Sequence, residues 1–184
     1  MDRVKSEYLP NYSYDDYIKW EGKWELINGV SYAMNPAHGI RHQIVSRNIH
    51  NELLHLLKDC IKCTALLPVD WRIPGKDDNN VLQPDNLITC KELKKDYITE
   101  TPVLIFEILS PSTAFKDRHL KYEIYESKGV KYYVIADGDK NIAEVYELSE
   151  SKYKKSIDAS EQFFKFFLND DCEINFNFKN IWVQ

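Results

Sequence analysis

The sequence lacks an excess of positive charge. Its 24 basic residues are outnumbered by 29 acidic residues, which gives a formal net charge of −5. Proteins that bind nucleic acid through a global basic field have the opposite balance, so that mode of binding is excluded and any contact with phosphates must be local. Fixed-period repeats and low-complexity runs are also absent, and aromatic residues are spread along the chain, which argues against a solenoid and against disorder.

Long apolar runs are missing as well. No stretch approaches the roughly 18 apolar residues of a membrane span, and no apolar signal segment is visible. We therefore expect no contact with a membrane and a cytoplasmic location, where the four cysteines stay reduced. Cys60 and Cys63 form an isolated CxxC motif, which needs two further ligands to bind zinc. Because Cys90 and Cys172 are single, the spacing indicates no zinc site.

The remaining composition is that of a globular protein. With 184 residues, 43% of them hydrophobic, the chain is long enough to bury a substantial core, and we expect one domain over residues 1–184. Ser13 followed by acidic residues predicts a short helix over residues 13–20. Asn28-Gly29 lies between alternating segments and is the strongest short signal of a hairpin. Further along, apolar residues at helical spacing predict a longer helix: Val45, Ile49, Leu53 and Leu56.

The second half of the chain is rich in strand patterns. The order strand, helix, strand over residues 103–136 fits a right-handed crossover between parallel strands, which favours an α/β fold. We also expect residues 152–157 and 162–167 to form a terminal antiparallel pair and the apolar tail after them to dock on the body. The other predicted elements are strands over 63–73, 81–89, 103–109, 130–136 and 140–148, and a helix from about Ala114 to Ser127.

One buried charge raises the question of function. Glu107 is the polar residue in the apolar run Val103–Leu109, which is typical of a strand covered on both faces. A carboxylate there loses its hydration, so it needs a cation, hydrogen-bond donors or a proton. The candidates nearby are a metal shared with Asp85 and the ammonium group of Lys121. Pro84 cannot donate a ladder hydrogen bond, which predicts an edge or a distortion beside Asp85.

Helical spacing carries Lys121 toward the interior. Asp117, Lys121 and Tyr125 share one face of the predicted helix with apolar residues that must turn toward the sheet. An ordinary surface pair of Asp117 with Lys121 is the alternative. His42 lies beside the buried stripe of its helix, where it is either a packed, hydrogen-bonded histidine or a catalytic one.

These residues resemble the motif of the PD-(D/E)XK nuclease superfamily, in which an acid follows proline and a second acid lies in an apolar strand. The common motif has its lysine two residues after the second acid, but Leu109 stands there in this chain. The flanking sequence is similar to the Uma-type restriction endonuclease family, whose lysine has moved to the following helix; Lys121 suits that role. The resemblance spans about residues 13–148 and is carried by Trp24–Gly29, Gln83–Asp85, Glu107–Thr113, Asp117, Lys121 and Tyr125.

The resemblance implies a restriction-endonuclease-like fold with a central mixed sheet flanked by helices. It also implies a Mg²⁺-dependent endonuclease acting on DNA, with Mn²⁺ as a substitute metal and a homodimer for duplex cleavage. Asp85, Glu107 and the carbonyl of Ile108 would bind the metal. Lys121 would orient or deprotonate the attacking water, or stabilise the developing charge. Glu25 is a further candidate acid that would bind the metal directly or through water, and Asp70 is a weaker candidate because its strand could run beside that of Asp85.

Two other functions are compatible with the same residues. One is a catalytically silent nuclease-fold module that binds nucleic acid or a protein partner. The presence of both acids and of Lys121 favours the enzyme, whereas the net charge of −5 and the absence of lysine at position 109 favour the silent module. A metal-dependent hydrolase of RNA or of another phosphodiester would use the same carboxylates, because their chemistry does not select the sugar.

Overall fold

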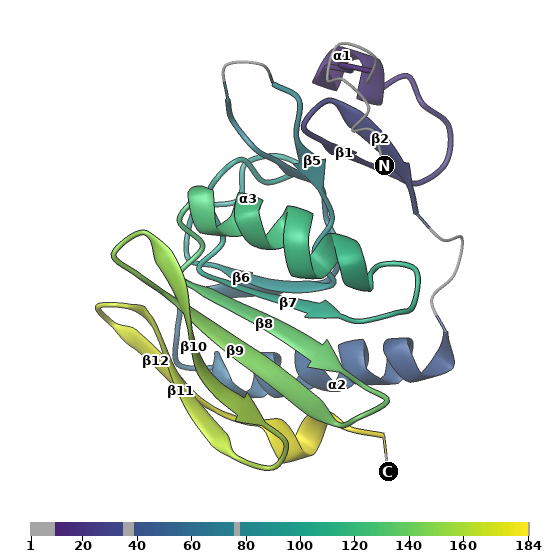
Figure 1. Ribbon diagram of the computed structural model, residues 1–184. Helices are drawn as coiled ribbons and strands as arrows, with labels where there is room; N and C mark the ends of the chain where they lie inside the picture. The colour runs from purple at the N-terminus through teal and green to yellow at the C-terminus, as the bar shows by residue number, and fades with distance from the viewer. Residues whose placement is uncertain (1–9, 35–38, 76–77, 184) are drawn as a thin grey trace.

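The computed structural model describes residues 10–34, 39–75 and 78–183. Its centre is a six-stranded mixed sheet with strand order β10-β9-β8-β7-β6-β3 (Figure 1). The neighbouring strands β7 and β8 are parallel, as the predicted crossover requires, and the other pairs are antiparallel. The strands of this sheet are β3 (Thr64–Leu66), β6 (Asn86–Thr89), β7 (Leu104–Ile108), β8 (Tyr132–Asp137), β9 (Ile142–Ser149) and β10 (Lys152–Ala159).

Helices cover both faces of this sheet. Alternate residues of a strand point to opposite faces, so Phe106 of β7 packs in one core with Val45 of α2 (Ile40–Leu56). Ile105 packs in a second core with Tyr125 of α3 (Tyr122–Ser127), which continues the π-helical turn η2 (Lys116–Lys121). Figure 1 shows α2 and α3 on opposite sides of β7 and β8. The predicted central mixed sheet flanked by helices is thus confirmed.

A smaller sheet lies at the N-terminal end of the chain. Its order is β2-β1-β5-β4, and the tight turn between its first two strands has positive φ at Asn28 (50°) and Gly29 (77°). The predicted hairpin is therefore confirmed, as is the short helix α1 (Tyr14–Tyr17), which Ser13 and Asp16 cap reciprocally. The strands of this sheet are β1 (Trp24–Ile27), β2 (Val30–Ala33), β4 (Trp71–Arg72) and β5 (Val81–Leu82).

Two predicted strands are broken between the sheets. Residues 63–73 divide into β3 of the central sheet and β4 of the small sheet, and residues 81–89 divide into β5 and β6. The second break falls at residues 83–85, so the distortion expected at Pro84 is confirmed. It lets one segment connect the two sheets and places Asp85 at their junction.

The predicted pairing of the last strands is wrong. Residues 152–157 pair with β9, and residues 163–169 pair with residues 172–177. Each strand joins its chain neighbour through a two-residue turn, at Glu150-Ser151 and at Asp170-Asp171, and such local hairpins close the shortest loops. The additional elements are β11 (Phe163–Asn169), β12 (Cys172–Asn177) and the 3₁₀ turn η3 (Phe178–Ile181).

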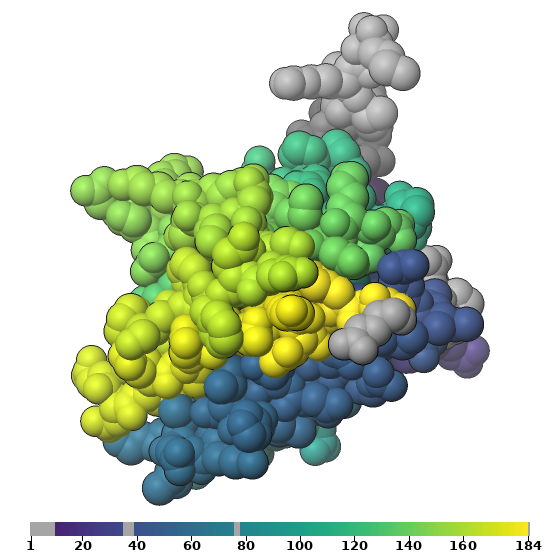
Figure 2. All heavy atoms as spheres, turned by 90° about the horizontal axis from the view of Figure 1, so that it is seen from below, coloured from purple at the N-terminus to yellow at the C-terminus, as the bar shows by residue number. Residues whose placement is uncertain are grey.

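The apolar tail docks on the body as predicted. Phe176, Phe178 and Ile181 are buried in the core that contains α2. The Asn48 side-chain amide donates a hydrogen bond to the Ile181 carbonyl at 3.2 Å. Figure 2 shows the C-terminal segment (yellow) lying against α2 (blue).

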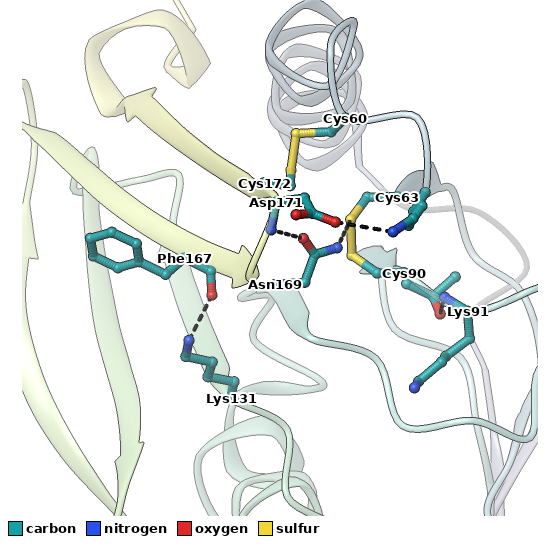
Figure 3. The surroundings of a disulfide bond; sticks show 11 residues. Cys60, Cys63, Cys90, Lys91, Lys131, Phe167, Asn169, Asp171 and Cys172 are labelled. Carbon is teal, nitrogen blue, oxygen red and sulfur yellow. Dashed lines mark hydrogen bonds and ion pairs between the residues drawn. A yellow bond between two sulfur atoms is a disulfide. The ribbon is translucent and has the colours of Figure 1, made fainter.

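The cysteines are paired, which corrects the prediction of reduced thiols. Disulfides join Cys60 to Cys172 and Cys63 to Cys90 (Figure 3). Thr64 pairs with Thr89 across β3 and β6, so Cys63 and Cys90, the next residues outward, face each other. The partners are 112 and 27 residues apart, a proximity that local sequence patterns do not reveal. Among the described residues, no helix is long and apolar enough to cross a membrane.

Candidate metal and lysine site

Two acidic residues meet where the small sheet joins the central one. Asp85 directly precedes β6, and Glu107 lies in the adjacent antiparallel strand β7, in which Phe106 is paired with Asn86. The register of these two strands therefore brings both carboxylates to one end of the sheet. Both side chains are buried. The structure therefore brings together two of the residues that the sequence predicted for the site.

Asp85 is held through a single carboxylate oxygen. Its Oδ2 atom accepts a hydrogen bond from the Ile108 backbone N–H at 2.8 Å and lies 3.2 Å from His42 Nε2. In the described structure these contacts leave Oδ1 without a hydrogen bond. His42 extends from α2 into the site, so the structure places it beside Asp85 and not merely in the core.

Glu107 is also held through one oxygen. Because side chains alternate across β7, Glu107 faces the side of the sheet that η2 and α3 cover. Its Oε1 atom accepts hydrogen bonds from the Tyr125 hydroxyl at 2.7 Å and from Lys121 Nζ at 2.9 Å. No described residue donates to Oε2, which leaves that atom available to a ligand.

Lys121 connects three carboxylates. Its Nζ atom lies 2.9 Å from both Glu107 and Glu25 and 3.7 Å from Asp117. The expected helical face is confirmed, although residues Lys116–Lys121 form a π-helical turn where an ordinary α-helix was predicted. The pair of Asp117 with Lys121 is buried and not a surface pair.

Glu25 is buried completely and both of its oxygens are occupied. Oε1 accepts a hydrogen bond from the Gln83 backbone N–H at 3.0 Å and contacts Lys121, and Oε2 accepts one from Lys116. Asp70 does not contact Glu25 directly but is linked to it through Gln83, whose side-chain amide donates a hydrogen bond to Asp70 at 2.5 Å.

Lys116 is the residue that the sequence did not indicate. In an α-helix, residues five apart lie on different faces, so Lys116 was not expected to share a site with Lys121. A π-helical turn has hydrogen bonds between residues five apart and brings both ammonium groups to Glu25. The only local signal was a second lysine at the start of the helix that carries Lys121.

The environment shifts the pKa values of these groups. Burial raises the pKa of Glu107 well above its usual range, and the neighbouring Asp117 and Asp85 carboxylates add to this effect while Lys121 opposes it. Burial alone would lower the pKa of Lys121, but the carboxylates of Glu107 and Glu25 outweigh it, so that pKa is raised and the lysine stays protonated. Burial also disfavours the Glu25 anion, but Lys121 and Lys116 lower its pKa overall.

The carboxylates line a pocket of about 280 Å³. Four carboxylates stand against two lysines there, and burial raises the pKa of Asp117, whose Oδ1 atom accepts no hydrogen bond from the described residues. Such an excess of buried negative charge is relieved either by protonation of a carboxyl group or by a bound cation. The charged residues that line the pocket are Glu25, Asp85, Glu107, Asp117, Lys116 and Lys121.

The donor set fits Mg²⁺. No group of three His, Cys, Asp or Glu side chains within the described ranges is arranged to hold a metal ion. Mg²⁺ is nevertheless commonly bound through one or two carboxylates, with waters and substrate phosphates completing its shell. The uncommitted oxygens of Asp85 and Glu107 supply that number of carboxylates at the wall of one pocket.

The arrangement of the sheet and its helices defines a restriction-endonuclease-like α/β protein. A crystal structure from Anabaena variabilis ATCC 29413, described as a putative nuclease belonging to DUF820, is similar over 92% of this chain and 96% of that chain, with a TM-score of 0.72 and 14% sequence identity. Residues 14–163 match the model of the family Uma2, described as "Putative restriction endonuclease". The chain therefore belongs to the Uma2 family.

One curated relative is similar in sequence. Over 125 residues the chain is 29% identical to the uncharacterized protein slr1290 of Synechocystis sp. (strain ATCC 27184 / PCC 6803 / Kazusa). The match covers 64% of this chain and 63% of that protein, so the chain spans less than two thirds of the length of this relative.

Proposed function

We propose that this protein is a Mg²⁺-dependent endonuclease that hydrolyses phosphodiester bonds of DNA. The observation that carries the proposal is the geometry of Asp85 and Glu107. Each carboxylate is fixed through one oxygen, keeps the other uncommitted and lines the same pocket as a buried lysine. Membership in the Uma2 family supports the reaction class.

Asp85, Glu107 and the backbone carbonyl of Ile108 would hold Mg²⁺, or Mn²⁺ in its place. When bound, such an ion neutralises phosphate charge and makes a coordinated water nucleophilic near neutral pH. The chain's own part is to fix the ligands. The Ile108 N–H and His42 orient Asp85, and the Tyr125 hydroxyl orients Glu107.

Lys121 contributes a positive charge inside the pocket. Its raised pKa, which follows from the carboxylates around it, favours a role as hydrogen-bond donor over a role as general base. It would orient the attacking water or stabilise charge that develops on the phosphate. Glu25 belongs to this catalytic group because its Oε1 atom lies 2.9 Å from the Lys121 ammonium, the same distance as Glu107 Oε1.

The wider setting of the activity is also proposed. Cleavage of both strands of a duplex requires two sites, which a symmetric homodimer of this chain would provide. We propose that residues 1–184 form one domain within each protomer and that the protein acts in the cytoplasm.

Cleavage of supercoiled plasmid DNA tests the activity. We expect nicked or linear product with Mg²⁺ or Mn²⁺ and none with a chelator, and a loss of roughly a hundredfold or more in Asp85→Asn and Glu107→Gln. Asp139→Asn, which changes an exposed acid outside the pocket, is the matched control and should cleave at the wild-type rate. Cleavage of RNA but not DNA would change the substrate, and no cleavage of either would favour a catalytically silent module.

A further inference from the structure

Two lysines enter the pocket, and their hydrogen-bonding capacity is used very differently. An ammonium group has three donors. Lys121 directs its Nζ toward three carboxylates, those of Glu107, Glu25 and Asp117, and only 4% of its side chain is exposed. Two of its donors are engaged by Glu107 and Glu25 at 2.9 Å, and the third faces Asp117 Oδ1 at 3.7 Å, which is too far for a hydrogen bond, so at most one donor remains for a ligand.

Lys116 has donors to spare. Within the described structure its one ionic partner is Glu25 Oε2, and 13% of its side chain is exposed, which is more than for Lys121. Its Nζ atom also lies 5.7 Å from the centre of the Tyr32 ring, and both residues line the pocket. Lys116 is therefore the better placed of the two ammonium groups to meet an anion that enters from solvent.

Glu25 fixes the position of Lys116. Its other oxygen is held by the Gln83 N–H and by Lys121, so the carboxylate cannot turn without breaking several contacts. The lowered pKa of Glu25 keeps this anchor ionised. With both oxygens occupied, Glu25 is suited to position lysines and not to ligate a metal ion.

We infer that Lys116 is a substrate-binding residue that contacts a phosphate oxygen of the nucleic acid, and that Glu25 is its positioning residue. The inference rests on the proposed function, because it assigns a contact to the substrate of the same pocket. It divides the work between the two lysines. Lys121 neutralises the carboxylates around it and acts on the attacking water or the developing charge, and Lys116 binds a phosphate oxygen of the substrate.

Binding of a fluorescent mixed-sequence DNA duplex tests this inference, with Ca²⁺ in place of Mg²⁺ to prevent turnover. We expect Lys116→Gln to bind roughly tenfold more weakly and to reduce the slope of log K against log[salt] by about 1, the effect of one lost phosphate contact. Lys116→Arg should restore both. Lys165→Gln, which removes a lysine paired with Glu173 on the β11–β12 hairpin, changes the net charge equally and should bind like the wild type.

Calorimetric Mn²⁺ binding separates this inference from the proposed function. We expect Lys116→Gln to bind Mn²⁺ at least as tightly as the wild type, because Lys116 contacts neither Asp85 nor Glu107. If Lys116→Gln unfolds, Glu25→Gln combined with Lys116→Gln replaces the buried pair by two amides and should show the same loss of salt slope. If Lys116→Gln binds DNA with the same affinity and the same salt slope as Lys165→Gln, the role of Lys116 is overturned and the proposed function is not. If the wild type binds neither DNA nor Mn²⁺, the proposed function and this inference are overturned together.

Discussion

The hydrogen bond from Tyr125 to Glu107 shows how single residues prepare the site. Tyr125 is completely buried, and its hydroxyl donates to the carboxylate oxygen that also contacts Lys121. Two donors on one oxygen fix the rotation of the carboxylate and leave the other oxygen without a donor among the described residues. His42 and the Ile108 N–H do the same for Asp85.

Tyr125→Phe should disturb the site more than the fold. Removing the hydroxyl leaves a buried carboxylate with one donor fewer, and we expect the free energy of unfolding to fall by roughly 1–2 kcal/mol. Mn²⁺ affinity should fall as well, because Glu107 is then free to rotate. Tyr153→Phe, which loses a buried hydrogen bond to the Val130 carbonyl, is the matched control. Urea unfolding and calorimetry should show a similar loss of stability in both variants but weaker Mn²⁺ binding only in Tyr125→Phe, and equal Mn²⁺ affinities would contradict this role.

At the scale of elements, the π-helical turn η2 is the part that brings the site together. It carries Lys116 and Lys121 and is fastened to the sheet by Arg118, whose guanidinium lies 2.6 Å from Glu144 of β9. Lys155 of β10 contacts the other oxygen of Glu144 at 2.8 Å. This ion-pair group therefore joins η2 to the two strands at one edge of the central sheet.

Glu144→Gln should loosen that connection in a pH-dependent way. Burial alone would raise the pKa of Glu144, but hydrogen bonds from Arg118 and Lys155 lower it to about 2 from an ordinary 4.5. A lowered carboxyl pKa contributes stability that is complete above pH 4.5 and is lost as the pH falls toward 2. We expect the variant to be less stable by roughly 1–2 kcal/mol at neutral pH. Urea unfolding at several pH values should show this difference shrinking in acid, and a difference that is constant or grows in acid would contradict the account.

Local patterns predicted most elements and the parallel crossover between β7 and β8, but they did not predict where the strands divide between the two sheets. The apolar run around Glu107 and the helical spacing of Lys121 and Tyr125 depend on neighbouring residues, so β7 and the helical face were predictable. Lys116 was not, because the π-helical turn that aligns it depends on tertiary contacts. The division of residues 81–89 between two sheets depends on pairing with distant strands, for which the sequence offered only Pro84 as a signal.

For the whole molecule, the two disulfides connect parts that are distant in the chain. They tie the turn that follows α2 to β12, and the residue before β3 to the residue after β6 (Figure 3). Their neighbourhood is further joined by the Asn169 amide, which donates to Cys63 Sγ at 3.3 Å. Disulfides persist in oxidising compartments and are rare in the cytosol, so this pairing weighs against the proposed cytoplasmic location.

Loss of the disulfide that closes the longer loop should lower the free energy of unfolding more than loss of the other disulfide. In the chain-entropy description, opening the Cys60–Cys172 loop of 112 residues destabilises the protein by about 1 kcal/mol more than opening the Cys63–Cys90 loop of 27 residues. Denaturant unfolding of Cys60→Ser with Cys172→Ser, against Cys63→Ser with Cys90→Ser, measures the difference. The reverse order of stabilities would contradict this expectation. Thiol titration of the denatured, unreduced wild type should find no free thiol, and four free thiols would show that neither disulfide forms.

The most direct test of the central claim is calorimetric Mn²⁺ binding to the purified protein, because it requires no knowledge of the substrate. The proposed site predicts binding by the wild type and no binding by Asp85→Ala or Glu107→Ala, with the fold of each variant intact by circular dichroism. Asp139→Ala should bind like the wild type. If the wild type binds no Mn²⁺, or if both site variants bind it as tightly as the wild type, then Asp85 and Glu107 do not form a metal centre and the proposed nuclease mechanism is contradicted.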